Sequence, residues 1–136
     1  MTGFDPEAWL EVAELCCHTA RQAAAEAHLR SALNRAYYAA LLVTKRRIEQ
    51  ALGTGAVPRA RTHHAILRAV RSGGPRFEHI HRVLQRLREF REAADYELRT
   101  GPLAWNTVYS QVQESRNLIR RHLKAIPDAE YRKLTL

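Results

Sequence analysis

The chain has 136 residues, 46% hydrophobic and 26% charged, with a formal net charge of +8 at pH 7. This composition suits one globular domain with a real core and argues against a disordered chain. No apolar run approaches the ~20 residues that span a bilayer, and the N-terminus has neither the basic nor the apolar segment of a secretion signal. We therefore expect a cytoplasmic protein with no membrane partner.

Alanine and leucine dominate the sequence, and their spacing predicts helices along the whole chain. Asp5 and Pro6 are typical of a helix start, and a short break is expected near residues 27–30. Thr62 is expected to cap the third helix, and glycine–proline pairs separate the later helices. The expected helices cover residues 5–26, 29–52, 63–71, 75–98 and 106–126.

These helices predict an all-α fold, an antiparallel four- to five-helix bundle with one short extra helix. Apolar and polar residues do not alternate with the period of two that is typical of a half-buried strand. We expect a single domain over residues 1–136, with a core at about residues 5–126 and a short C-terminal tail at residues 127–136.

Two stretches combine small residues with polar ones. In residues 31–40, four alanines would let another helix come close, so Arg35, Tyr37 and Tyr38 must be accommodated beside that contact. Adjacent helical residues cannot face the same way, so one tyrosine is expected in the core and the other at a boundary. Residues 91–96 repeat the combination of arginine, small residues, an acid and a tyrosine, which suggests one shared site.

Charge and the remaining motifs narrow the function. Nine arginines and two glutamates lie between Arg59 and Arg91, which favours an anionic partner such as RNA or a nucleotide. The histidines lack metal-ligand spacing, and neither a serine-nucleophile motif nor a glycine-rich phosphate loop occurs. Adjacent Cys16 and Cys17 fit core packing in a reducing compartment. We expect no metal and no cofactor.

The two polar stretches, Arg35-Ala-Tyr-Tyr-Ala39 and Arg91-x-x-Ala-Asp-Tyr96, together resemble the HEPN superfamily over about residues 8–125. The resemblance implies a helical bundle that is usually a homodimer. It also implies a role in a nucleic-acid-linked defence or toxin–antitoxin-type module. Many members are metal-independent ribonucleases; others bind nucleotides or a protein partner, often a nucleotidyltransferase, without catalysis.

The resemblance implies that Arg35, Tyr38, Arg91, Asp95 and Tyr96 line a groove that binds RNA or a nucleotide. Active members carry a histidine four to six residues after an arginine, but positions 40–42 are apolar here. The catalytic candidates are therefore Arg35 with His64, or with His63, from the neighbouring loop. Other pairs have similar spacing: Arg21 and His28, Arg59 and His64, Arg76 and His81, and Arg116 and His122.

A different class of function remains open on the same residues. Arg35, Arg91, Asp95 and Tyr96 could form a buried polar network in a non-catalytic dimerisation or protein-interaction module. A binding groove requires both arginines partly open to solvent, whereas a structural network requires them closed. A third interpretation uses the stripe of Trp9, Val12 and Cys16 on the first helix as a partner surface.

Overall fold

The computed structural model describes residues 5–20, 25–96 and 104–136, except for the side chains of residues 20, 25, 26, 95 and 96. Every regular element in these ranges is helical, which confirms the all-α prediction. The elements are α1 (Glu7–Ala20), α2 (Ala25–Leu52), α3 (Thr62–Ser72), α4 (Pro75–Tyr96), α5 (Trp105–Asn117), the π-helical turn η1 (Leu118–His122), α6 (Leu123–Ala125) and α7 (Asp128–Tyr131).

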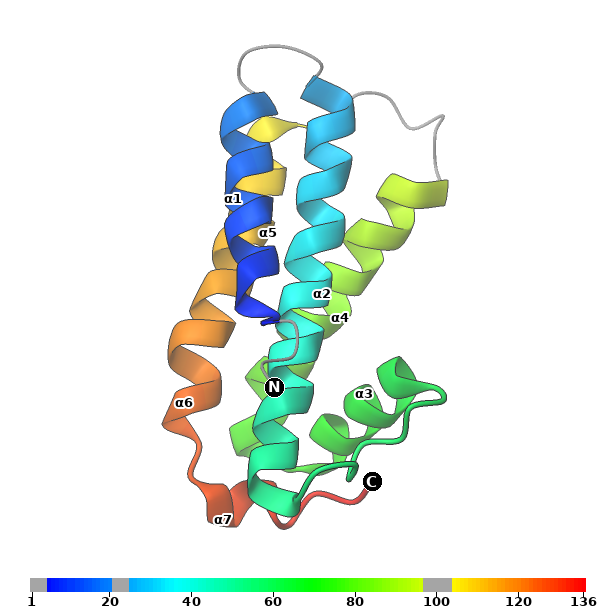
Figure 1. Cartoon of the computed structure of the whole chain (residues 1–136), viewed down its shortest axis with the longest axis vertical. Helices are drawn as coiled ribbons and strands as arrows, with labels where there is room; N and C mark the ends of the chain where they lie inside the picture. Colours follow the sequence, from blue (N-terminus) through cyan, green and yellow to red (C-terminus); the bar gives the residue numbers. More distant parts are fainter. Residues whose placement is uncertain (1–4, 21–24, 97–103) are drawn as a thin grey trace.

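The long helix α2 is the centre of the bundle, with α1, α4 and α5 packed around it (Figure 1). Its small residues explain this position, because a helix that is alanine-rich on several sides can be approached from several sides. The alanines of the first polar stretch are all buried: Ala32, Ala36, Ala39 and Ala40. The Ser115 hydroxyl on α5 donates a hydrogen bond to the Ala36 carbonyl at 2.8 Å, which shows how closely these helices meet.

Helix α1 runs antiparallel to α2 (Figure 1). Its start agrees with the prediction, since the Asp5 carboxylate accepts a hydrogen bond from the Glu7 backbone N–H at 3.0 Å. Arg46 on α2 pairs with Asp5 at 2.9 Å and with Glu7 at 3.0 Å, which fixes this end against α2. The break expected at residues 27–30 is wrong, because these residues are helical and belong to α2. Residues 21–24 lie outside the described part of the chain.

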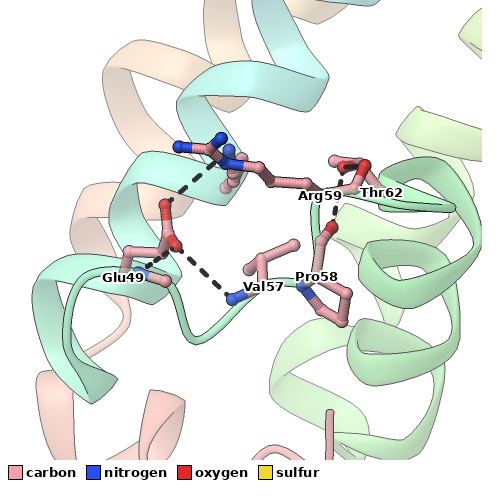
Figure 2. Close-up of polar contacts among 7 residues, drawn as sticks. Glu49, Val57, Pro58, Arg59 and Thr62 are labelled. Carbon is pink, nitrogen blue, oxygen red and sulfur yellow. Dashed lines mark hydrogen bonds and ion pairs between the residues drawn. The ribbon is translucent and has the colours of Figure 1, made fainter.

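The loop between α2 and α3 is organised by Glu49, whose carboxylate accepts the backbone N–H groups of Gly55 at 2.7 Å and Val57 at 3.4 Å (Figure 2). Thr62 does not cap α3 as predicted. Its hydroxyl instead donates to the carbonyls of Pro58 and Arg59 at 2.8 and 2.9 Å, so it closes the loop (Figure 2). Arg61 occupies the N-cap position of α3 with a φ of 59°, and its side chain makes no capping hydrogen bond.

The C-terminal part differs in detail from the single helix expected over residues 106–126. The helix is interrupted at Leu118, where the wider π-helical turn η1 begins. The expected tail at residues 127–136 packs on the bundle through α7. Tyr131 is fully buried, lies 5.2 Å from the Phe77 ring and donates to the Leu123 carbonyl at 2.6 Å. The Arg47 guanidinium of α2 stacks on the Tyr131 ring, 4.3 Å from its centroid.

Candidate functional site

The two adjacent tyrosines of α2 face different surroundings, as the sequence predicted. Tyr37 has 0% relative exposure, whereas Tyr38 is partly buried at the edge of the core. Their ring centroids lie 5.4 Å apart at an interplanar angle of 64°. Burial raises the pKa of Tyr37 to about 12, so its phenol stays neutral at physiological pH. Tyr37 is therefore out of reach of a ligand, and Tyr38 is the tyrosine that a ligand can approach.

His63, in the first turn of α3, contacts both tyrosines. Its Nδ1 lies 2.7 Å from the Tyr37 hydroxyl oxygen, and its ring lies 5.6 Å from that of Tyr38, edge to face. Burial lowers the pKa of His63, and the positive charges of Arg91 and Arg88 lower it further. The imidazole is consequently neutral near pH 7, the form that can accept a proton.

Arg91 of α4 adds a third helix to the contact between α2 and α3. Its guanidinium lies 5.2 Å from the centroid of the Tyr37 ring and 5.5 Å from that of Tyr38. Its Nη1 donates a long hydrogen bond of 3.4 Å to the Tyr38 hydroxyl. Arg88, one turn earlier on α4, pairs with Glu92 at 2.9 Å. We call the group formed by Tyr37, Tyr38, His63, Arg88 and Arg91 the aromatic–arginine cluster.

Arg35 lies beside this cluster and not at its centre. Its guanidinium stacks on the Trp9 ring of α1, 4.6 Å from the centroid, and Trp9 lies 5.7 Å from Tyr38. The Trp9 ring of α1 therefore contacts both Arg35 and Tyr38 and lies between them. Arg35 and Arg91 are each partly exposed. The side chains of Asp95 and Tyr96, at the end of α4, lie outside the described residues.

The structure also separates the two histidines that the sequence left as alternatives. His63 faces the tyrosines of α2, whereas His64 is exposed and lines a groove between α3 and α4. We call this hollow of about 820 Å³ the α3–α4 groove. Sequence reasoning noted the local excess of arginine but not that several of these residues share one groove.

The other arginine–histidine pairs lie in different settings. Arg116 faces Glu14 at 3.8 Å, and His122 packs on His79 of α4 with ring centroids 4.3 Å apart. His81 lines the α3–α4 groove with His64. Arg21 lies outside the described residues.

The fold and this arrangement agree with what a comparison with protein families found. The family model of the HEPN domain matches residues 6–125. The chain belongs to the HEPN family. The comparison with curated proteins and the comparison with solved structures each found no match. Nucleotide- or RNA-linked chemistry is therefore the class of function to test for this HEPN protein, and its own residues must supply the detail.

Two features are absent from the described part of this HEPN protein. Three or more histidine, cysteine, aspartate or glutamate side chains do not gather there in a way that could hold a metal ion. None of the described helices combines the length and the apolar character needed to cross a membrane.

Proposed function

We propose that this HEPN protein binds RNA or nucleotide phosphates at the aromatic–arginine cluster. The observation that carries the proposal is the convergence of Tyr38, Arg88 and Arg91 with a neutral His63 on three helices. An arginine fork suits phosphate oxygens, and an accessible tyrosine ring provides a stacking surface for an unpaired base. Arg35 on Trp9 supplies a further positive charge next to Tyr38.

Tyr37 has a positioning role in this proposal, because it is fully buried and cannot touch a ligand. A neutral imidazole carries one N–H. If Nδ1 carries the proton and donates it to the Tyr37 oxygen, Nε2 of His63 is left as a proton acceptor. In that tautomer, Tyr37 holds the orientation of the ring and leaves His63 able to act as a base.

A second candidate, metal-independent RNA cleavage, is favoured by this state of His63. Nε2 would accept the proton of a ribose 2′-hydroxyl as the 2′-oxygen attacks the adjacent phosphorus. The 5′-oxygen would leave with a proton returned by the imidazolium, giving a 2′,3′-cyclic phosphate and a 5′-hydroxyl. Arg91 would stabilise the charge on the phosphoryl oxygens.

The competing interpretation is a structural network of Arg35, Arg91, Asp95 and Tyr96, which would require both arginines to be closed to solvent. Arg35 and Arg91 are instead partly exposed, which supports the binding role. A protein-interaction role has its own support in α1, where Val12 is 41% and Leu15 is 63% exposed. We propose that this apolar surface serves a homodimer or a nucleotidyltransferase-type partner. We place the protein in a nucleic-acid-linked defence or toxin–antitoxin-type module.

The test is binding and cleavage of labelled RNA in EDTA by the wild type and by Arg91→Ala, Arg35→Ala, His63→Asn and His64→Asn. Loss of affinity in Arg91→Ala, with a smaller loss in Arg35→Ala, is expected. If the protein cleaves RNA, His63→Asn should abolish cleavage while retaining binding, and His64→Asn should still cleave. Arg132→Ala, at an exposed C-terminal position, is the control for loss of one charge. Equal effects of Arg91→Ala and Arg132→Ala would contradict the proposed site.

A further inference from the structure

The α3–α4 groove is lined by basic side chains, most of which lie on the α3 wall. On α3 and the residue before it, basic side chains recur at intervals of three or four, the spacing that places them on one face of a helix. The lining residues of α4 follow the same interval, although the middle one is a glutamine. The wall of α3 carries Arg61, His64, Arg68 and Arg71, and that of α4 carries His81, Gln85 and Arg88. Carboxylates are absent from the residues that line the groove.

Within the described residues, the arginines of the α3 wall form no ion pair with an acid. Arg61, Arg68 and Arg71 are exposed, and ion pairs within the described residues involve other arginines, such as Arg46 and Arg47. Like charges held on one face repel one another, and a bound polyanion would relieve that repulsion. The charge of the α3 wall is therefore available to a ligand, whereas Arg88 on the α4 wall is paired with Glu92.

The lining also indicates which part of a ligand the groove would hold. It contains arginine, histidine, glutamine and aliphatic residues but no tyrosine, tryptophan or phenylalanine. Such a surface suits phosphate groups better than stacked bases. From Arg61 to Arg71 the wall is about 15 Å long at the rise of an α-helix, which is longer than a single phosphate needs.

Arg88 joins this groove to the aromatic–arginine cluster. It lines the groove, and its charge also acts on Tyr37 and His63. A strand with its backbone in the groove would thus bring a neighbouring nucleotide to Tyr38. Because a base must be unpaired to stack on that ring, the strand must be single-stranded at this point.

We propose, on the basis of the proposed function, that the α3–α4 groove binds the phosphate backbone of single-stranded RNA whose neighbouring nucleotide occupies the aromatic–arginine cluster. The ligand is then a strand of several nucleotides and not a free nucleotide. Binding is independent of sequence within the groove, and it weakens with added salt.

The experiment measures fluorescence anisotropy of labelled oligouridylates, from a dinucleotide to a dodecamer, over a range of salt concentrations. The groove variant is Arg68→Gln/Arg71→Gln. Its matched control is Arg120→Gln/Arg121→Gln, which removes the same charge from two exposed positions on η1. Circular dichroism verifies that both variants are folded.

The groove variant should weaken dodecamer binding by about tenfold or more and leave dinucleotide binding within about twofold. The slope of log affinity against log salt should become shallower by about 1.4, since each phosphate contact on a single strand contributes about 0.7. The control should stay within about twofold of the wild type. An equal loss in the control would overturn the groove proposal, because net charge alone would then explain it.

Three other outcomes would also overturn the proposal. They are a dinucleotide that binds as tightly as the dodecamer, a duplex that binds as tightly as the single strand, and polyglutamate that binds in the groove where RNA does not. Arg91→Ala separates the groove from the cluster. If Arg91→Ala binds like the wild type but the groove variant does not, the cluster proposal fails and the groove remains an RNA-backbone site.

Discussion

The Tyr37 hydroxyl oxygen and Nδ1 of His63 lie 2.7 Å apart, and this contact joins the middle of α2 to the first turn of α3. The tyrosine is in the core and the histidine is at its edge. The contact therefore fixes the first turn of α3. This turn lies between the aromatic–arginine cluster and the α3–α4 groove. Both proposed binding surfaces depend on how this turn is held.

Removing the Tyr37 hydroxyl should weaken the attachment of α3 to α2. Tyr37→Phe is expected to lower the free energy of unfolding by about 0.5–1.5 kcal/mol, the net value of one hydrogen bond, because the ring itself remains packed. Urea denaturation measures the change. Tyr38→Phe is the matched control and should change it less, since the Tyr38 hydroxyl accepts only a 3.4 Å bond. A larger effect for Tyr38→Phe would show that the Tyr37–His63 contact is not the main attachment.

Stability should fall on acidification as His63 takes up a proton. Its pKa in the folded protein lies below the value of 6.5 for an unperturbed histidine. Between these two values the unfolded chain binds more protons than the folded one, so the free energy of unfolding decreases as the pH falls through this window. Burial and His122 also lower the pKa of His79, which adds to the same trend.

Urea denaturation at about pH 7.5 and about pH 5.5 measures this dependence. His63→Asn should make it shallower, while His64→Asn, at an exposed position, should retain the wild-type dependence. An unchanged dependence in His63→Asn would show that His63 does not contribute to the acid sensitivity.

The close approach of α2 and α5 should make Ala36 intolerant of a larger side chain. Ala36→Leu is expected to destabilise the fold by about 1–3 kcal/mol through overpacking, because the Ser115 hydroxyl lies 2.8 Å from the Ala36 carbonyl. Ala27→Leu on the exposed part of α2 is the control and should stay within about 0.5 kcal/mol. Thermal and urea unfolding would measure both. Tolerance of leucine at position 36 would show that the two helices can separate there at little cost.

The C-terminal segment should contribute strongly to stability although the sequence there suggests only a tail. Tyr131→Ala is expected to cost about 3–5 kcal/mol, because it removes a fully buried aromatic side chain. Tyr131→Phe should cost about 0.5–1.5 kcal/mol, because it removes only the hydrogen bond to the Leu123 carbonyl. Urea denaturation distinguishes the two. Little change in Tyr131→Ala would mean that α7 is not part of the cooperative fold.

Local sequence patterns predicted where most of the helices lie but not how the residues at some helix ends are bonded or packed. The Thr62 hydroxyl could cap a helix or close a loop, and the position of the preceding carbonyls decided for the loop. The break near residues 27–30 was a weak local signal, and those residues are helical within α2. Tyr131 was not recognised as a core residue because its partners, Phe77 and Leu123, lie on other elements.

The sequence by itself determined the helical fold, the HEPN family, the basic character, and the rule that only one of Tyr37 and Tyr38 can be in the core. The helical fold, the charge and the tyrosine rule follow from periodicity, composition and the geometry of one helix, whereas the family was inferred from the resemblance of two polar motifs. Only the tertiary structure decided that His63 and not His64 faces the tyrosines. It also decided that arginines of α3 and α4 share one groove. The physical reason is that such contacts join residues far apart in the chain, and their distances depend on how the helices pack.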